Sequence, residues 1–236
     1  MPDPTPRAHQ LAVRRTARYF TLGAASAATR ELWYVCHGYG QLAAEFIRHC
    51  AVLDDGARLV VAPEGLNRYY RNPDPLRHKE GGVGATWMTS EARELEIEDY
   101  VAYLDLLHAS VTSGAAASGA DVAALRVVVL GFSQGAATAA RWVALGRAAA
   151  HELVLWGGLL PPDLGADGLR RVAAVRLSVV YGTRDQYATS KVLAAEEARL
   201  TREGLRPRRL TFDGGHRLDD ATLATLATGP APPDGA

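Results

Sequence analysis

The stretch that decides the fold is VVVLGFSQGAATAA, residues 127–140, where an unbroken apolar run leads directly into an alanine-rich segment. The run is apolar on both faces, which is typical of a central parallel strand. Gly131, Ser133 and Gly135 then form the pattern G-x-S-x-G, in which a tight strand-to-helix turn holds the serine Oγ clear of the sheet. The two glycines leave room where a Cβ would collide with a neighbouring strand or helix. The pattern therefore predicts that Ser133 is a nucleophile.

Strand-length apolar runs alternate with segments of helical period on both sides of this corner. Strands are expected at residues 17–22, 31–38, 57–65, 125–131, 151–158, 175–182 and 207–215, the first two forming a hairpin. Helices are expected at residues 42–53, 90–111 with Ser90 as N-cap, 133 onward, 190–204 and 219–227. Residues 66–87 are expected to form a long functional loop, with a lid role left open, and residues 113–121 a flexible connection.

This alternation predicts an α/β fold with a mostly parallel central sheet and helices on both faces. We expect a flexible N-terminus over residues 1–12, a single domain over 13–228 and a flexible tail over 229–236. The segment 157–171 is short and contains Pro161 and Pro162, so no large lid domain is expected there. Function in such sheets concentrates on loops at the carboxyl ends of the strands.

The composition narrows the functional classes. The 236 residues carry 26 basic and 26 acidic side chains, so the formal net charge is zero. Neither a basic stripe for nucleic acid nor a polybasic or long apolar run for stable membrane association is present in the sequence. Cys36 and Cys50 lack disulfide-framework and metal-ligand spacing, and we interpret them as buried thiols of a cytoplasmic protein. No cofactor or metal is expected, and the oligomeric state stays open.

A serine nucleophile needs a base and a carboxylate that orients the base. On a fold of this kind the acid and then the histidine follow the serine along the chain. Asp185 lies three residues past Gly182, at the end of an apolar strand, and His216 follows a Gly-Gly turn that closes the last strand. We therefore expect Ser133, Asp185 and His216 to meet at one rim of the sheet.

Other side chains compete for the two supporting roles. Asp213 or Asp219, which flank His216, could replace Asp185 as the orienting acid, as could Asp163 or Asp167. Four other histidines are expected to have structural or solvated roles; they are His49, His78, His108 and His151.

The oxyanion of the tetrahedral intermediate needs two hydrogen-bond donors. One would be the backbone N–H of Gln134, the residue after the nucleophile. The other would be the backbone N–H of Tyr39, which follows an early strand ending at His37 and Gly38. His37 is expected to brace this turn through its ring.

Aromatic and apolar side chains on the predicted loops indicate the substrate side. Those expected to line a pocket for an acyl or aryl group are Tyr39, Tyr69, Tyr70, Trp87, Met88 and Tyr187. The alternative is that Trp87 and Met88 pack beneath the long loop. Without a large lid, the pocket would be open and suited to small, soluble substrates.

The chain resembles the phospholipase/carboxylesterase family of α/β-hydrolases, which includes acyl-protein thioesterases, over roughly residues 30–225. Four family patterns carry the resemblance: H-G-x-G-D at residues 37–41, G-F-S-Q-G-G at 131–136, G-x-x-D-x-x-V at 182–188 and a Trp-Met-Thr stretch at 87–89. A fifth, G-x-x-H, is tighter by one position at Gly214-Gly215-His216. Residues 62–70 and 84–89 resemble a bacterial subgroup of predicted esterases.

The resemblance implies hydrolysis of a carboxylic ester or thioester through an acyl-enzyme, with no cofactor. Gln41 stands where the family has Asp, Ala136 where it has Gly, and Ala188 where it has Val, so the substrate cannot be transferred from the family. Two alternatives remain open: an acyltransferase or peptidase that uses the same triad, and a binding protein that keeps the fold without catalysis.

Overall fold

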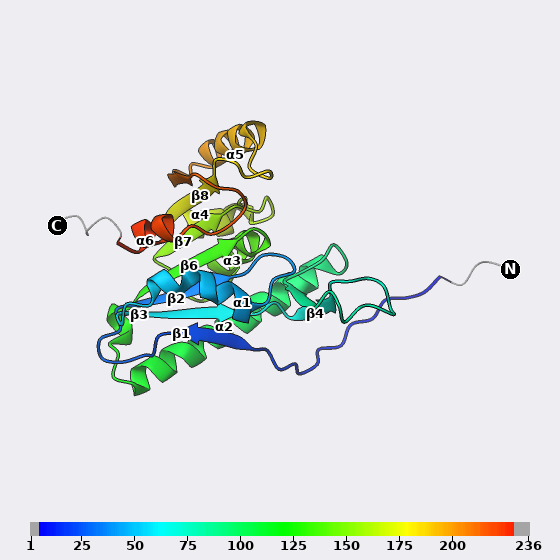
Figure 1. Ribbon diagram of the computed structural model, residues 1–236, viewed down its shortest axis with the longest axis horizontal. Coiled ribbons are helices and arrows are strands. Elements are labelled where there is room, and N and C mark those ends of the chain that lie inside the picture. The colour runs from blue at the N-terminus through cyan, green and yellow to red at the C-terminus, as the bar shows by residue number, and fades with distance from the viewer. Residues whose placement is uncertain (1–4, 229–236) are drawn as a thin grey trace.

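The computed structural model describes residues 5–228, and its centre is a seven-stranded sheet (Figure 1). The strand order is β1-β3-β2-β6-β7-β8-β9, in which β1 is antiparallel and all other pairs are parallel. The strands are β1 (Tyr19–Leu22), β2 (Glu31–Cys36), β3 (Arg58–Pro63), β6 (Arg126–Phe132), β7 (Glu152–Trp156), β8 (Arg176–Gly182) and β9 (Arg208–Phe212). The predicted mostly parallel sheet is confirmed.

The register of the sheet brings the strand ends to one edge. Cys36 at the end of β2 lies opposite Gly131 of β6, and Phe132 lies opposite Trp156 at the end of β7. Gly182 at the end of β8 lies opposite Phe212 of β9. The loops that follow these strands therefore all leave from the same rim, where ligands bind in open parallel sheets.

Helices cover both faces of the sheet. They are α1 (Ala43–Phe46), the 3₁₀ helix η1 (Ile47–Leu53), α2 (Arg93–Ala117), the 3₁₀ helix η2 (Val122–Ala124), α3 (Gln134–Leu145), α4 (Gly165–Ala173), α5 (Ser190–Arg202) and α6 (Asp220–Thr228). One buried core joins the sheet to α2, α3, α4 and α5, and a second joins its other face to α1, η1 and α6. None of the helices within residues 5–228 is both long enough and apolar enough to cross a bilayer.

The expected hairpin between the first two strands is wrong. β1 pairs with β3 instead, antiparallel, with Tyr19 opposite Pro63. β2 is already hydrogen-bonded to β3 on one side and to β6 on the other, so it has no free edge for β1.

Two expected helices differ from those observed. Residues 43–53 form a short α-helix that continues as 3₁₀ helix, whose buried Ile47, Cys50 and Leu53 recur every three residues, the 3₁₀ period. Ser90 is not the N-cap of α2. The N-cap is Ala92, whose backbone is in the left-handed region with a φ of 46°. At its other end α2 runs on to residue 117 because Ala115 is buried against the core, so most of the expected flexible connection is helix.

The structure adds elements that the sequence did not indicate. The expected loop 66–87 contains a two-stranded antiparallel sheet of β4 (Asn67–Tyr70) and β5 (Val83–Thr86), separate from the main sheet (Figure 1). Helix α4 lies between the expected strands 151–158 and 175–182, where no helix was expected.

Cys36 and Cys50 are buried and free, as predicted. The expected flexible tail 229–236 lies outside the described residues, as does the start of the expected flexible N-terminus, whose described part has neither helix nor strand.

Candidate active site

Ser133 occupies the turn between β6 and α3 in a backbone conformation that L-residues rarely adopt. Its φ is 55° and its ψ is −117°. Such a conformation costs of the order of 1–3 kcal/mol and persists only where its surroundings enforce it. Part of that enforcement is a hydrogen bond from the Ser133 N–H to the carbonyl of Trp156, at 2.8 Å.

The two glycines of the motif allow backbone to touch backbone. A Cβ on Gly131 would overlap the carbonyl of Gly135, one turn into α3. A Cβ on Gly135 would lie 2.6 Å from the carbonyl oxygen of His37 and nearer still to that of Cys36. The start of α3 therefore rests directly on the end of β2, and only glycine permits this approach at either position.

His216 and Asp185 meet at the ends of β9 and β8. The Asp185 Oδ2 atom lies 2.7 Å from His216 Nδ1. Asp185 Oδ1 accepts the backbone N–H of Tyr187 at 2.9 Å, which fixes the carboxylate in a nearly solvent-free position. Because an ionised carboxylate can only accept, Nδ1 must carry the ring proton, so the free lone pair of neutral His216 is on Nε2.

Ser133 lies beside this pair. A Cβ on Gly157 would be 3.0 Å from His216 Cε1, and a Cβ on Gly158 would be 2.6 Å from the Ser133 carbonyl oxygen. The Phe132 ring packs against the imidazole with centroids 4.8 Å apart. The hydrogen bonds within residues 5–228 include none from Ser133 Oγ to His216. Such catalytic hydrogen bonds commonly tighten only when substrate binds.

The competing acids are occupied elsewhere. Asp213 forms an exposed ion pair with Arg184. Asp219 accepts the N–H and the hydroxyl of Thr222 in the first turn of α6, at 3.1 and 2.8 Å. Asp163 is paired with the buried Arg141 and with Arg93, and Asp167 with Arg170. Among the five candidates, only Asp185 is hydrogen-bonded to His216.

The loop after β2 is held by contacts from a distant segment. Gly38 N–H donates to the side-chain Oε1 of Gln41 at 2.8 Å. Gly40 N–H donates to the carbonyl of Ala85 in β5 at 2.8 Å, and the Ala85 N–H returns to Gln41 O at 3.3 Å. Within residues 5–228 the backbone N–H groups of Tyr39 and Gln134 have no acceptor. They are therefore free to donate to a ligand.

His37 is buried and braces this loop, in agreement with the expectation. Its Nδ1 bonds the carbonyl of Gly38 at 2.8 Å, and its Nε2 accepts the N–H of Gly65 at 3.0 Å. An acceptor role at Nε2 requires a neutral ring. Burial lowers the pKa of His37 below its ordinary value, although the hydrogen bond to Gly38 and the nearby Glu64 charge act in the opposite direction.

This buried histidine predicts acid-sensitive stability. Since its pKa is lower in the folded protein, the unfolded chain binds a proton first as the pH falls below about 6.5, and unfolding is favoured. We expect the free energy of unfolding to fall by up to about 1.4 kcal/mol per pH unit for this group between about pH 6.5 and its lower folded pKa. Urea titrations across this range measure it.

The matched variant is His37→Asn, which keeps a donor and an acceptor but does not titrate. It is expected to be less stable at neutral pH and to show a shallower loss on acidification. His108, whose pKa burial also lowers, contributes equally to both proteins and cancels in the comparison. Equal slopes for the two proteins would contradict the assignment.

The expected substrate-binding tyrosines do not all lie together. The rings of Tyr39 and Tyr69 pack together with centroids 5.5 Å apart, and Tyr187 stands edge-on to His216 at 4.8 Å. Tyr70 is half-exposed, and its ring packs on that of His78. The structure therefore places Tyr39, Tyr69 and Tyr187 around the rim of the site.

Trp87 and Met88 lie deeper than expected. Trp87 is only 1% exposed, stacks on His37 and donates its indole N–H to the His37 carbonyl at 2.8 Å. Met88 is partly buried, with its sulfur 3.4 Å from Arg141. This is the alternative arrangement in which both residues pack under the loop, so Trp87 supports the site from behind.

Two sets of contacts that support the site were not indicated by any sequence pattern. The Gln134 side chain binds the end of β5 and the segment after it: its amide N–H groups donate to the Thr86 hydroxyl and the Met88 carbonyl, both at 2.9 Å. Glu64, 1% exposed, joins Arg18, Arg68 and the N–H of Ala43. Burial opposes its ionisation, but the hydrogen bonds from the two arginines hold the pKa of Glu64 below its ordinary value.

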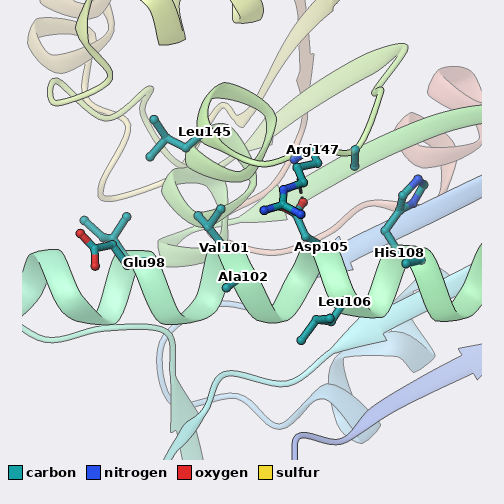
Figure 2. Close-up of a pocket in the computed structure, with 11 residues that line it drawn as sticks. Glu98, Val101, Ala102, Asp105, Leu106, His108, Leu145 and Arg147 are labelled. Atoms are coloured by element: carbon teal, nitrogen blue, oxygen red, sulfur yellow. Dashed lines mark hydrogen bonds between the residues drawn. The ribbon is translucent and has the colours of Figure 1, made fainter. Parts of the chain in front are cut away.

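A groove lies away from the rim of the candidate site. It has a volume of about 670 Å³ and runs along α2, where Figure 2 shows Val101, Asp105 and His108 facing Leu145 and Arg147. None of the expected site residues lines it. The groove is therefore separate from the candidate active site.

The strand order, the serine turn after β6 and the acid and histidine after β8 and β9 define an α/β-hydrolase fold. The fold class predicted from the sequence is confirmed.

Solved structures share this fold, whereas no protein-family model and no curated protein matches the chain. The esterase PE8 is 20% identical, with a TM-score of 0.63 over 91% of this chain and 97% of that one. Acyl-protein thioesterase 2 of Zea mays is 16% identical, with a TM-score of 0.65 over 90% and 97%. A carboxylesterase from Mesorhizobium loti is 20% identical, with a TM-score of 0.62 over 90% and 93%. These proteins are of the kinds that the sequence motifs resemble.

Proposed function

We propose that this protein is a serine hydrolase that cleaves carboxylic esters or thioesters of small, soluble substrates. The observation that carries the proposal is the His216 Nδ1–Asp185 Oδ2 hydrogen bond of 2.7 Å beside a serine held at φ 55°. A structural turn needs neither a buried carboxylate aimed at an imidazole nor a strained serine at a helix N-terminus. With two free cysteine thiols, the proposed setting is the reducing cytoplasm.

The reaction follows from the positions of the donors and acceptors. Ser133 Oγ attacks the acyl carbon while its proton passes to His216 Nε2, and Asp185 stabilises the resulting imidazolium. The backbone N–H groups of Tyr39 and Gln134 receive the negative charge on the carbonyl oxygen. The leaving oxygen or sulfur takes the proton from Nε2. Water then attacks the acyl-enzyme by the same route, with His216 as base, and releases the acid.

The sequence motifs and the known proteins of this fold support an ester or thioester substrate. The similar structures include two esterases, named for ester bonds, and an acyl-protein thioesterase, named for thioester bonds. The open rim around Tyr39 and Tyr187, both more than half exposed, favours small substrates. A peptidase would need a peptide subsite, which no observation favours, whereas an acyltransferase would pass the acyl group to an alcohol or amine instead of water, and product analysis with an added alcohol or amine distinguishes it.

A fluorophosphonate probe tests the proposal directly, because its phosphorus is attacked only by an activated serine. We expect one covalent adduct per chain, located on Ser133 by peptide mass spectrometry. A folded protein that remains unlabelled would refute the proposal.

A further inference from the structure

A second, smaller cleft lies directly against His216. Its volume is about 450 Å³, and it is formed between α1, η1 and the chain that connects β9 to α6. The residues that line it are Gln41, Phe46, His49, Phe132, His216, Arg217, Leu218, Asp219, Asp220 and Ala221. Neither Tyr69 nor Met88 is among them, so the cleft is distinct from the aromatic side of the site.

The chemistry assigns one half of the substrate to this cleft. In ester cleavage the bond that breaks joins the acyl carbon to the leaving oxygen, and that oxygen takes its proton from His216 Nε2. The leaving alcohol must therefore lie beside the imidazole. Since His216 and Phe132 both line the cleft, it is positioned to hold the alcohol part of the ester.

Gln41 supplies a hydrogen-bond donor at the mouth of this cleft. Its Oε1 accepts the Gly38 N–H, and a backbone donor can be met only by the amide oxygen, so the amide nitrogen must be Nε2. Within residues 5–228 Nε2 has no acceptor. The point that a Cβ on Gly38 would occupy lies 3.0 Å from Gln41 Oε1 and 3.2 Å from Ser133 Cβ, so the amide is next to the nucleophile.

The far side of the cleft adds further polar groups. Neither the His49 ring nor the Asp220 carboxylate has a hydrogen-bond partner among the described residues, whereas Arg217 and Asp219 are paired with each other. Phe46, Phe132 and Leu218 supply an apolar surface between them. A hydroxyl group both accepts and donates, so it can bond Gln41 Nε2 and Asp220 alike, which an alkyl chain cannot.

We propose that this cleft binds alcohol leaving groups that carry additional hydroxyls, as in glycerol or sugar esters, and that Gln41 Nε2 donates to one of those hydroxyls. The inference rests on the proposed hydrolase function. It makes Gln41, which stands where the related family has an acid, a residue that selects the leaving group.

The test compares two butyrate esters of nearly equal shape, 1-monobutyrin and propyl butyrate, which differ by two hydroxyls in the alcohol. Wild-type kcat/KM is expected to be roughly tenfold or more higher for monobutyrin. With propyl butyrate the donor of Gln41 is left without a partner, and an unpaired donor of this kind costs about a factor of ten or more. Gln41→Glu keeps an oxygen for the Gly38 N–H but removes the donor, and should reduce this preference about tenfold. His49→Ala, which leaves the loop containing Tyr39 unchanged, should also reduce the preference for monobutyrin.

Arg48→Ala is the matched control, because Arg48 is exposed on the same 3₁₀ helix and does not line the cleft. Its monobutyrin preference should equal that of the wild type. A wild-type ratio near one, or a ratio that neither Gln41→Glu nor His49→Ala changes, would overturn the inference while leaving the hydrolase proposal intact. Failure of the fluorophosphonate to label the folded protein would instead refute the hydrolase proposal itself.

Discussion

Ser133→Ala is expected to lower the turnover of p-nitrophenyl butyrate by roughly 10⁴-fold or more. In the proposed mechanism, the substitution removes the atom that forms the acyl-enzyme. The free N–H groups at residues 39 and 134 would still bind the carbonyl oxygen, so a small residual rate above that of water is expected. Steady-state kinetics at saturating substrate measures the loss in kcat, and fluorophosphonate labelling should disappear with it.

The loss must be separated from a folding defect. Alanine has a Cβ like serine and meets the same φ of 55°, so the unfolding midpoint should stay close to that of the wild type. Ser118→Ala, at the exposed C-terminal end of α2, is the control and should leave turnover unchanged. A folded Ser133→Ala protein with a kcat within tenfold of the wild type would exclude Ser133 as the nucleophile.

Asp185→Asn is the second large effect, with an expected fall in kcat of roughly 10³–10⁴-fold. The asparagine Oδ1 can still accept the Tyr187 N–H, so the side chain should stay in place. Its amide nitrogen would then face His216 Nδ1 as a donor, which forces the ring proton onto Nε2. In that tautomer the imidazole cannot accept the serine proton, and the imidazolium also loses its counter-charge.

Asp213→Asn provides the matched comparison. Asp213 lies three residues before His216 and pairs with Arg184 at the surface. Because exposed ion pairs contribute little, we expect no more than about a threefold change in kcat and about 0–1 kcal/mol in stability. Should Asp213→Asn cost more activity than Asp185→Asn, the orienting acid has been assigned to the wrong residue.

The sequence predicted the mostly parallel sheet and the contact of Asp185 with His216, because both follow from local patterns. β6 is a mostly buried apolar run that ends at Gly131 and Phe132, and β8 and β9 are each followed by a glycine-containing turn that carries a polar side chain. Parallel strands place such ends on one edge. The contact between Asp185 and His216 could therefore be predicted without knowing any loop conformation.

Other features depend on contacts between segments far apart in the chain. Nothing in residues 17–22 indicates that β1 joins β3 and not β2, because that choice depends on which edges are already paired. The pairing of β4 with β5 joins residues across a long connection, and neither strand has a marked alternation of apolar residues. The burial of Trp87 likewise depends on His37, fifty positions earlier, which offers a stacking ring and a carbonyl.

The start of α3 approaches the end of β2 so closely at Gly135 that no Cβ fits there, because it would overlap the carbonyls of Cys36 and His37. The N–H groups of Tyr39 and Gln134, which we propose stabilise the oxyanion, lie just after β2 and at the start of α3, so their spacing is set by a contact that needs no side chain at residue 135. In the proposed hydrolase, we expect that residues such as Tyr69, Tyr187 and His49 can be exchanged to admit a new substrate while these two N–H groups keep their spacing. An evolving or engineered descendant of this chain is accordingly free to change what it recognises one residue at a time.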